Sequence, residues 1–162
     1  MTTFVPRVSD LTRERISREF DDLGPQACLV EIAGVLSKEN PEILDIMERC
    51  AEDVRGSRTS VMTGFAMFYR LLVAEARLVR GLALPRVTAE TRAQIVDEIT
   101  KYGESQFTLA ACDQLQRDNP ELLQMAEMFA SRHQDYLAMM QGFCLVYRTL
   151  TLQSTLEYGS VH

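Results

Sequence analysis

The sequence repeats itself after 79 residues, and this repeat constrains the fold more than any other feature. Residues 6–9 recur as 85–88, and residues 36–44 recur as 115–123. About 15 of the 46 positions between residues 6 and 51 are identical to the position 79 residues later. A fixed period of this kind indicates that one structural unit is written twice. We therefore expect a tandem duplication, with residues 1–84 as the first repeat and 85–162 as the second.

Beyond residue 51 the offset between the copies falls to 78. There the identical residues are Gly64, Phe65, Tyr69 and Arg70 in the first copy and Gly142, Phe143, Tyr147 and Arg148 in the second. An insertion of one residue inside a helix would rotate every following side chain by about 100° and disrupt its buried face. The change of offset is therefore expected in a loop, at residues 55–60 or at residues 131–134.

Helix-terminal signals divide each copy into four helices. Ser9 and Thr88 are N-cap candidates, and Gly24 and Gly103 are expected to end the first helices in a left-handed conformation. The pattern Asn-Pro-Glu, at residues 40–42 and 119–121, predicts an Asn cap, a Pro in the first turn and an acid at the positive end of the helix dipole. The expected helices span residues 10–22, 25–39, 41–54, 59–80, 89–102, 104–118, 120–131 and 134–157.

The expected fold is an all-α bundle of two four-helix repeats. Period-2 alternation is absent from the sequence, so no strand is predicted. Residues 82–85 are too few for a flexible linker, so the two repeats of about 79 residues should pack as one compact, pseudo-two-fold symmetric unit. A domain of about 80 residues is hard to stabilise alone, which points to a homodimeric ancestor.

Charge and apolar patterning argue against nucleic-acid and membrane partners. The 23 acidic residues exceed the 17 basic ones, giving a net charge of −6. Affinity for a polyanion or an anionic membrane rises with clustered Lys and Arg, and the sequence has no basic run. The uncharged stretches 60–69 and 136–147 are shorter than a membrane span, and residues 1–7 lack the pattern of a signal peptide. The sequence therefore predicts a soluble cytoplasmic protein.

The four cysteines and the other reactive residues predict no catalytic, cofactor or metal site. None of the cysteines, at positions 28, 50, 112 and 144, follows CxxC spacing, and they are expected as small buried hydrophobes in a reducing compartment. Neither histidine, at positions 133 and 162, has a Glu three residues before it, as di-iron bundles require. Nucleophile-elbow, P-loop, dinucleotide and zincin motifs are absent from the sequence, so we expect no enzyme, no cofactor and no metal.

The repeated Gly-Phe-x-x-x-Tyr-Arg segment is the most distinctive motif. Its Phe, its Tyr and a Leu three residues later share one helix face and form an apolar stripe, and the Gly permits close helix approach. The first interpretation is structural: the stripe is core, and Arg70 and Arg148 pair with Glu42 and Glu121. The second is a site, in which the arginines hold a carboxylate or phosphate. The candidate ligand-binding residues are Tyr69, Arg70, Tyr147 and Arg148.

Methionines gather near the third and fourth helices of each repeat. Methionine fills irregular cores, and it is also over-used on surfaces that bind varied partners. The structural interpretation places these residues in the core. The alternative is an exposed groove for a partner helix, for which the candidate partner-binding residues are Met125, Met128, Met139 and Met140.

Three functions follow from these features. The first is a non-enzymatic helical interaction module, such as an adaptor, chaperone-like factor or regulator, that binds a protein partner or forms a homodimer. The second is a binder or sensor of small anionic ligands that uses the Tyr-Arg positions.

The third function is a transcriptional regulator. Residues 12–16, Phe20, Gly24 and residues 31–33 resemble the opening of a TetR-type helix-turn-helix regulator, over about 25 residues. In that family a recognition helix follows the Glu-Ile-Ala at 31–33. Here the sequence runs directly into the cap at residue 40, and the second copy has no counterpart of Glu-Ile-Ala. No nucleic-acid partner is therefore expected.

Overall fold

A computed structural model describes residues 8–52, 58–79, 81, 84–132 and 136–159, and these residues are almost entirely helical. The first half contains α1 (Asp10–Leu23), α2 (Pro25–Glu39), α3 (Pro41–Glu52) and α4 (Arg58–Ala74), which continues into a π-helical turn at Glu75–Val79. The second half contains α5 (Ala89–Tyr102), α6 (Glu104–Asp118), α7 (Pro120–Ser131) and α8 (Tyr136–Gly159). The described residues form no strand, so the all-α prediction is confirmed.

The first three helices have the same lengths in the two halves. Helices α1 and α5 each have 14 residues, α2 and α6 have 15, and α3 and α7 have 12. Residues 55–57 and 133–134, where the sequence offset was expected to change, lie outside the described residues.

The helix boundaries follow the signals in the sequence. Ser9 and Thr88 cap α1 and α5, since each side-chain oxygen accepts a hydrogen bond from the backbone N–H three residues later. Gly24 and Gly103 both have φ of 84°, which confirms the expected positive φ. Their ψ angles of 158° and 157° differ from a left-handed helical residue, because each glycine also starts the next helix.

The asparagines at 40 and 119 directly precede α3 and α7 as predicted, and Asn119 is the N-cap of α7 with Pro120 in the first turn, but the expected side-chain cap was wrong. Asn119 makes no side-chain cap bond to α7. The Asn40 amide instead reaches into the second half of the chain, where its Nδ2 donates to the Pro85 carbonyl at 3.1 Å and its Oδ1 accepts from the Val87 N–H at 2.9 Å. Asn40 is only 2% exposed, so these bonds replace water that burial removes.

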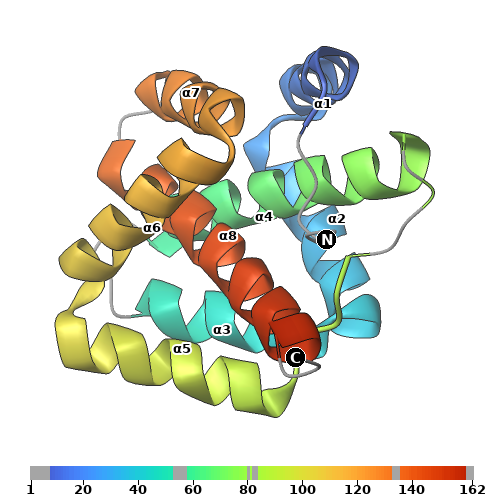
Figure 1. The fold of residues 1–162 in the computed structure, drawn as a ribbon. Helices are drawn as coiled ribbons and strands as arrows, with labels where there is room; N and C mark the ends of the chain where they lie inside the picture. The colour runs from blue at the N-terminus through green and yellow to red at the C-terminus, as the bar shows by residue number, and fades with distance from the viewer. Residues whose placement is uncertain (1–7, 53–57, 80, 82–83, 133–135, 160–162) are drawn as a thin grey trace.

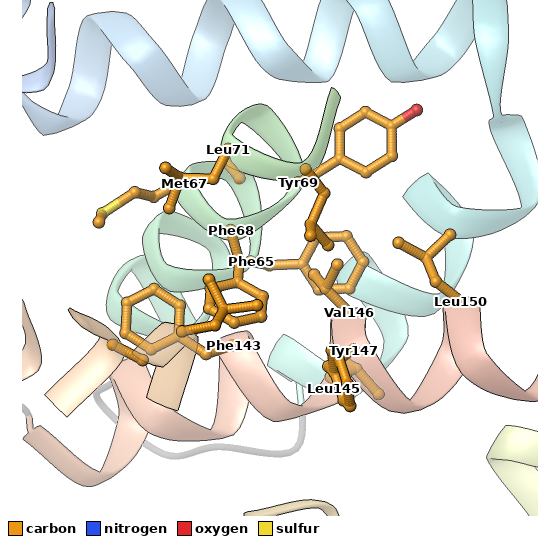
Figure 2. Close-up of a cluster of buried hydrophobic side chains, with 14 of the residues drawn as sticks. Phe65, Met67, Phe68, Tyr69, Leu71, Phe143, Leu145, Val146, Tyr147 and Leu150 are labelled. Atoms are coloured by element: carbon orange, nitrogen blue, oxygen red, sulfur yellow. The ribbon is translucent and has the colours of Figure 1, made fainter. Parts of the chain in front are cut away.

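Helices α4 and α8 cross at the centre of the molecule and make its most extensive helix contact (Figure 1). The crossing is close because glycines lie at it. A Cβ on Gly64 would lie 2.4 Å from the Met139 carbonyl oxygen, and one on Gly142 would lie 2.2 Å from the Val61 carbonyl oxygen. Around the crossing Figure 2 shows the buried aromatic cluster, in which the rings of Phe68 and Phe143 are 5.0 Å apart. The predicted apolar stripes of both fourth helices are buried here.

The other helices surround this central pair. In Figure 1, α1 and α7 lie at one end of the molecule, and α3 and α5 lie at the other. At the α3–α5 end, Arg92 of α5 reaches two carboxylates of α3, those of Glu42 at 3.2 Å and Asp45 at 2.7 Å. At the α1–α7 end, the rings of Phe20 and Phe129 meet edge to face with their centroids 6.2 Å apart.

The end of α4 differs from the expected continuous helix over residues 59–80. It turns from α-helical to π-helical at Glu75, a change that inserts one residue into a helical turn. Glu75 is buried and its Oε1 accepts from the Ser9 N–H at 2.5 Å, at the start of α1. In the second half Gln153 accepts from the Thr88 N–H at 2.9 Å. The two fourth helices thus hold the N-termini of the two first helices.

Candidate functional site

The two tyrosines of the repeated motif are buried, with their hydroxyls bonded inside the protein. Tyr147 donates to the Asp118 carboxylate at 3.3 Å. Tyr69 hydrogen-bonds the Asn40 side chain, and burial raises the pKa of Tyr69 above its ordinary value in spite of that bond. Figure 2 shows Tyr69 at the edge of the aromatic cluster with its hydroxyl directed away from it. The tyrosines therefore complete the core rather than line a cleft.

The two arginines pair with the first helix of their own half. Arg70 of α4 lies 3.2 Å from the Glu19 carboxylate on α1. Arg148 of α8 binds Glu98 of α5 through two bonds, of 3.2 Å from Nε and 2.8 Å from Nη2. The expected pairs with Glu42 and Glu121 were wrong: α3 and α7 do pack against α4 and α8, but the two arginines reach the first helices instead. A signal for the observed partners is present in the sequence, since Glu19 and Glu98 are themselves repeated at the offset of 79.

A cleft of about 320 Å³ opens beside the Arg148–Glu98 pair, between α5 and α6. A volume of this order is sufficient for a small ligand. Three further polar groups border the cleft from α6, the guanidinium of Arg117 and the amides of Gln106 and Gln114, with Tyr102 on the α5 side. The sequence-derived candidates contribute Arg148 to this cleft, while Arg117 and Gln114 were not predicted.

Two hollows border Arg70. One, of about 740 Å³, is lined by residues of α1, among them Leu11, Arg18 and Glu19. The other, which corresponds to the cleft beside Arg148, measures only about 20 Å³ and is lined by Glu31 and Cys28, among others. The residues 79 positions later are Ala110 and Phe107, and both line the larger cleft. The loss of the Glu31 side chain at Ala110 leaves room beside Arg148. The two Tyr-Arg positions are therefore not equivalent as ligand sites.

The four candidate partner-binding methionines do not share one exposed surface. Met125, Met139 and Met140 are buried in the core, and only Met128 is exposed, at 51%. The buried three belong to the hydrophobic core, where the structural interpretation places them, and their flexible thioethers suit such packing. Met128 projects from α7 on the side that faces α1.

A groove between α1 and α7 contains Met128. It has a volume of about 220 Å³, and its lining combines apolar and charged groups from the two helices: Arg13, Glu14, Ser17, Met125, Met128 and Phe129. Exposed Leu11, at 72%, lies one turn before Glu14 on α1. The sequence signal for this groove was the methionine cluster, but its α1 wall was not predicted.

The cysteines are less uniformly buried than expected. Cys144 is buried, but Cys28 and Cys112 are half-buried, and the Cys50 side chain lies outside the described residues. The Cys112 and Cys144 sulfur atoms lie 3.1 Å apart. Burial raises the pKa of Cys28, and the nearby carboxylates of Glu19 and Glu31 add to that shift.

Comparisons with known proteins add no further constraint on the site. No family model, no curated protein and no solved structure matches the chain. Among the described residues, no group of three or more His, Cys, Asp or Glu side chains could hold a metal ion. No helix in the described part of the chain is long and apolar enough to cross a membrane.

Proposed function

We propose that this protein is a non-enzymatic interaction module that binds an amphipathic helix of a partner protein in the groove between α1 and α7. The observation that carries the proposal is the difference between the two ends of the molecule. The α3–α5 end is closed by the ion pairs of Arg92. The α1–α7 end has an open groove with an apolar floor.

Residue changes between the halves accompany this difference, although Glu121 retains the counterpart of Glu42. Arg13 is the counterpart of Arg92, but position 124, the counterpart of Asp45, is Gln. Arg13 pairs instead with Asp10 on its own helix. Met128 stands where the first half has Arg49, so the α7 wall is less charged than the α3 wall. The α3–α5 pair is thus closed by ion pairs, whereas the α1–α7 pair has an exposed apolar wall.

The chemistry of the groove defines its occupant. Phe129, Met125 and Met128 offer an apolar floor to side chains spaced at i, i+3 or i+4 on one face of a helix. Arg13 lines the groove and pairs with Asp10, whose side chain is exposed, so an acidic side chain beside the apolar face of the partner would share Arg13 with Asp10. Surface ion pairs contribute little energy, so the floor supplies affinity and Arg13 supplies orientation.

A display library of random helical peptides tests the proposal directly. Selected peptides should share apolar residues on one helix face with an acid beside them, and Met128→Glu in this protein should weaken their binding at least about tenfold. Arg13→Glu should select against the acidic peptides specifically. Leu109→Glu is the matched control, because Leu109 on α6 is similarly exposed, at 59% against 51% for Met128, and lies outside the groove.

Two results would refute the proposal. The first is peptide binding that Leu109→Glu abolishes and Met128→Glu does not. The second is a homodimer, seen by sedimentation or native mass spectrometry, that Met128→Glu dissociates. The occupant would then be a second copy of this chain.

A second candidate function is supported by the α5–α6 cleft. Arg117 and Arg148 border it, so a small carboxylate or phosphate could bind there. Glu98 already neutralises Arg148, which makes this function the weaker one. A thermal-shift screen of anionic metabolites tests it, because a bound ligand raises the unfolding midpoint. The shift should vanish in Arg117→Ala, and a hit that Arg117→Ala leaves unchanged would exclude the cleft.

We further propose that the two halves arose by duplication and are related by a pseudo-two-fold axis. The matched helix lengths and the paired contacts support this proposal. Arg70–Glu19 has its counterpart in Arg148–Glu98, and Ser9–Glu75 has its counterpart in Thr88–Gln153. Superposition of an experimental structure on itself after rotation tests it. Helices that fail to overlay in the order α1–α4 on α5–α8 would contradict it.

A further inference from the structure

Cys112 of α6 and Cys144 of α8 bring their sulfur atoms within 3.1 Å of each other. A disulfide bond is about 2.05 Å long, so a bond requires an approach of about 1 Å between side chains of two helices already in contact. Both residues are free thiols. The corresponding positions in the first half are Ala33 and Ala66, so α2 packs against α4 there without a pair of sulfur atoms.

The two thiols differ in their access to solvent. Cys144 is completely buried, whereas Cys112 is half-buried. An oxidant in solution therefore meets the Cys112 sulfur first. The pair thus consists of a half-buried thiol beside a fully buried one, which is the arrangement of an attacking and a resolving cysteine.

The hydrogen bond between the sulfurs also makes Cys112 the more easily ionised of the two thiols. When the Cys144 S–H donates to Cys112, it stabilises the Cys112 thiolate and so lowers the pKa of Cys112. The same bond, together with burial, raises the pKa of Cys144. Burial and the nearby carboxylates of Glu127 and Asp113 oppose the effect on Cys112 without reversing it. The thiolate is the reactive form of cysteine, so Cys112 is the more reactive member.

We propose that Cys112 and Cys144 form a dithiol site that a hydroperoxide oxidises to an intramolecular disulfide. The Cys112 thiolate attacks one oxygen of ROOH, the O–O bond breaks, and the alkoxide takes up a proton to leave as ROH. The Cys144 sulfur then attacks the sulfenic acid of Cys112, the S–O bond breaks, and the hydroxide leaves as water with the Cys144 proton. The two thiols lose two electrons in total, and the peroxide gains them.

The bond would join α6 to α8. Because α6 also carries Gln114 and Arg117, oxidation would fix one wall of the α5–α6 cleft against the central helix. The site is independent of the proposed α1–α7 groove, since neither cysteine lines that groove.

Treatment of the intact reduced protein with one equivalent of hydrogen peroxide tests the site. Peptide mapping should recover a Cys112–Cys144 cross-link, a mass loss of two hydrogen atoms and the loss of two thiols per chain. Dithiothreitol should restore both thiols. The unfolding midpoint of the oxidised chain should be higher, because a cross-link restricts the unfolded state.

Variants separate the roles of the two sulfurs. In Cys144→Ala the sulfenic acid of Cys112 should persist and react with dimedone about tenfold more than in the unchanged protein. Cys112→Ala should leave Cys144 reduced, and Cys28→Ala should leave the cross-link intact. Alanine already occupies both corresponding positions of the first half, which supports folding of the variants, and circular dichroism checks it.

The proposal is overturned by oxidation that first involves Cys28 or Cys50, or that first links two chains. It is also overturned if the unchanged protein accumulates sulfenic or sulfinic acid at Cys112 without the cross-link, because Cys144 would then not resolve the intermediate.

Discussion

The Asn40 side chain, at the start of α3, hydrogen-bonds the second half of the chain. Its amide satisfies the Val87 N–H and the Pro85 carbonyl, and both bonds are buried. Asn40→Ala leaves these two buried groups and the Tyr69 hydroxyl without that partner, so we expect a loss of about 3 kcal/mol in the free energy of unfolding, measured with urea. Ser37→Ala is the control, because that hydroxyl bonds only an exposed carbonyl of its own helix, and it should cost under about 0.5 kcal/mol.

Tyr69 should give the stability of the protein a dependence on alkaline pH. Burial raises the pKa of Tyr69 above 10, so above that pH the folded state holds a proton that the unfolded state has lost. Its contribution to stability is therefore complete below about pH 10 and is lost as the pH rises through the folded-state pKa. Between about pH 8 and pH 11, Tyr69→Phe should lose less stability than the unchanged protein. A Tyr102→Phe control that flattens the profile equally would contradict the assignment, because Tyr102 is exposed.

At the scale of single residues, the sequence predicts poorly which side chains contact one another. Arg70 and Arg148 were recognised as a repeated pair, but their carboxylate partners are on the first helices rather than the third. The pairing depends on which helix faces which, and helical spacing alone does not contain that information. The contact between the Cys112 and Cys144 sulfurs was missed for the same reason, since 31 residues separate them in the sequence.

The crossing of α4 and α8 is the element-scale feature most sensitive to substitution. Gly142→Ala would place a Cβ 2.2 Å from the Val61 carbonyl oxygen and 2.6 Å from the Phe65 nitrogen, both backbone atoms. The helices must separate to admit it, so we expect a loss of about 3 kcal/mol or more and a lower thermal midpoint. Gly34→Ala in α2 meets no neighbouring atom and should instead stabilise the protein by about 0.5–1 kcal/mol. Equal effects of the two substitutions would show that the helices do not approach this closely.

Helix boundaries were the most predictable aspect of the fold, because their causes are local. The predicted bounds of α5 and α6 coincide with the observed ones, since Thr88, Gly103 and Asn119-Pro120 each fix one end through their own backbone or ring. The π-helical turn at Glu75 was not predicted. That turn accompanies a bond to the distant residue Ser9, and only the tertiary structure brings the two together.

At the scale of the whole molecule, the two halves are joined by contacts that neither can make alone. Helices α4 and α8 share one core, Asn40 binds the segment before α5, and Arg92 binds α3. The repeat in the sequence predicted that all eight helices belong to one unit. It did not predict the open α1–α7 groove, which lies where the two halves of the sequence differ, as with Gln124 at the position that corresponds to Asp45.

If residues 1–84 and 85–162 are expressed separately, each segment therefore lacks the helices that bury its apolar face. Alone, the first segment exposes the face of α4 that carries Phe65 and Phe68, and the second exposes the face of α8 that carries Phe143. We expect neither segment to be a cooperatively unfolding monomer, since each would self-associate or remain partly unfolded. An equimolar mixture should gain helicity and show one cooperative thermal transition by circular dichroism, with sedimentation reporting a one-to-one complex. A segment that unfolds cooperatively as a monomer, near the midpoint of the intact chain, would show that its core is complete without the other half.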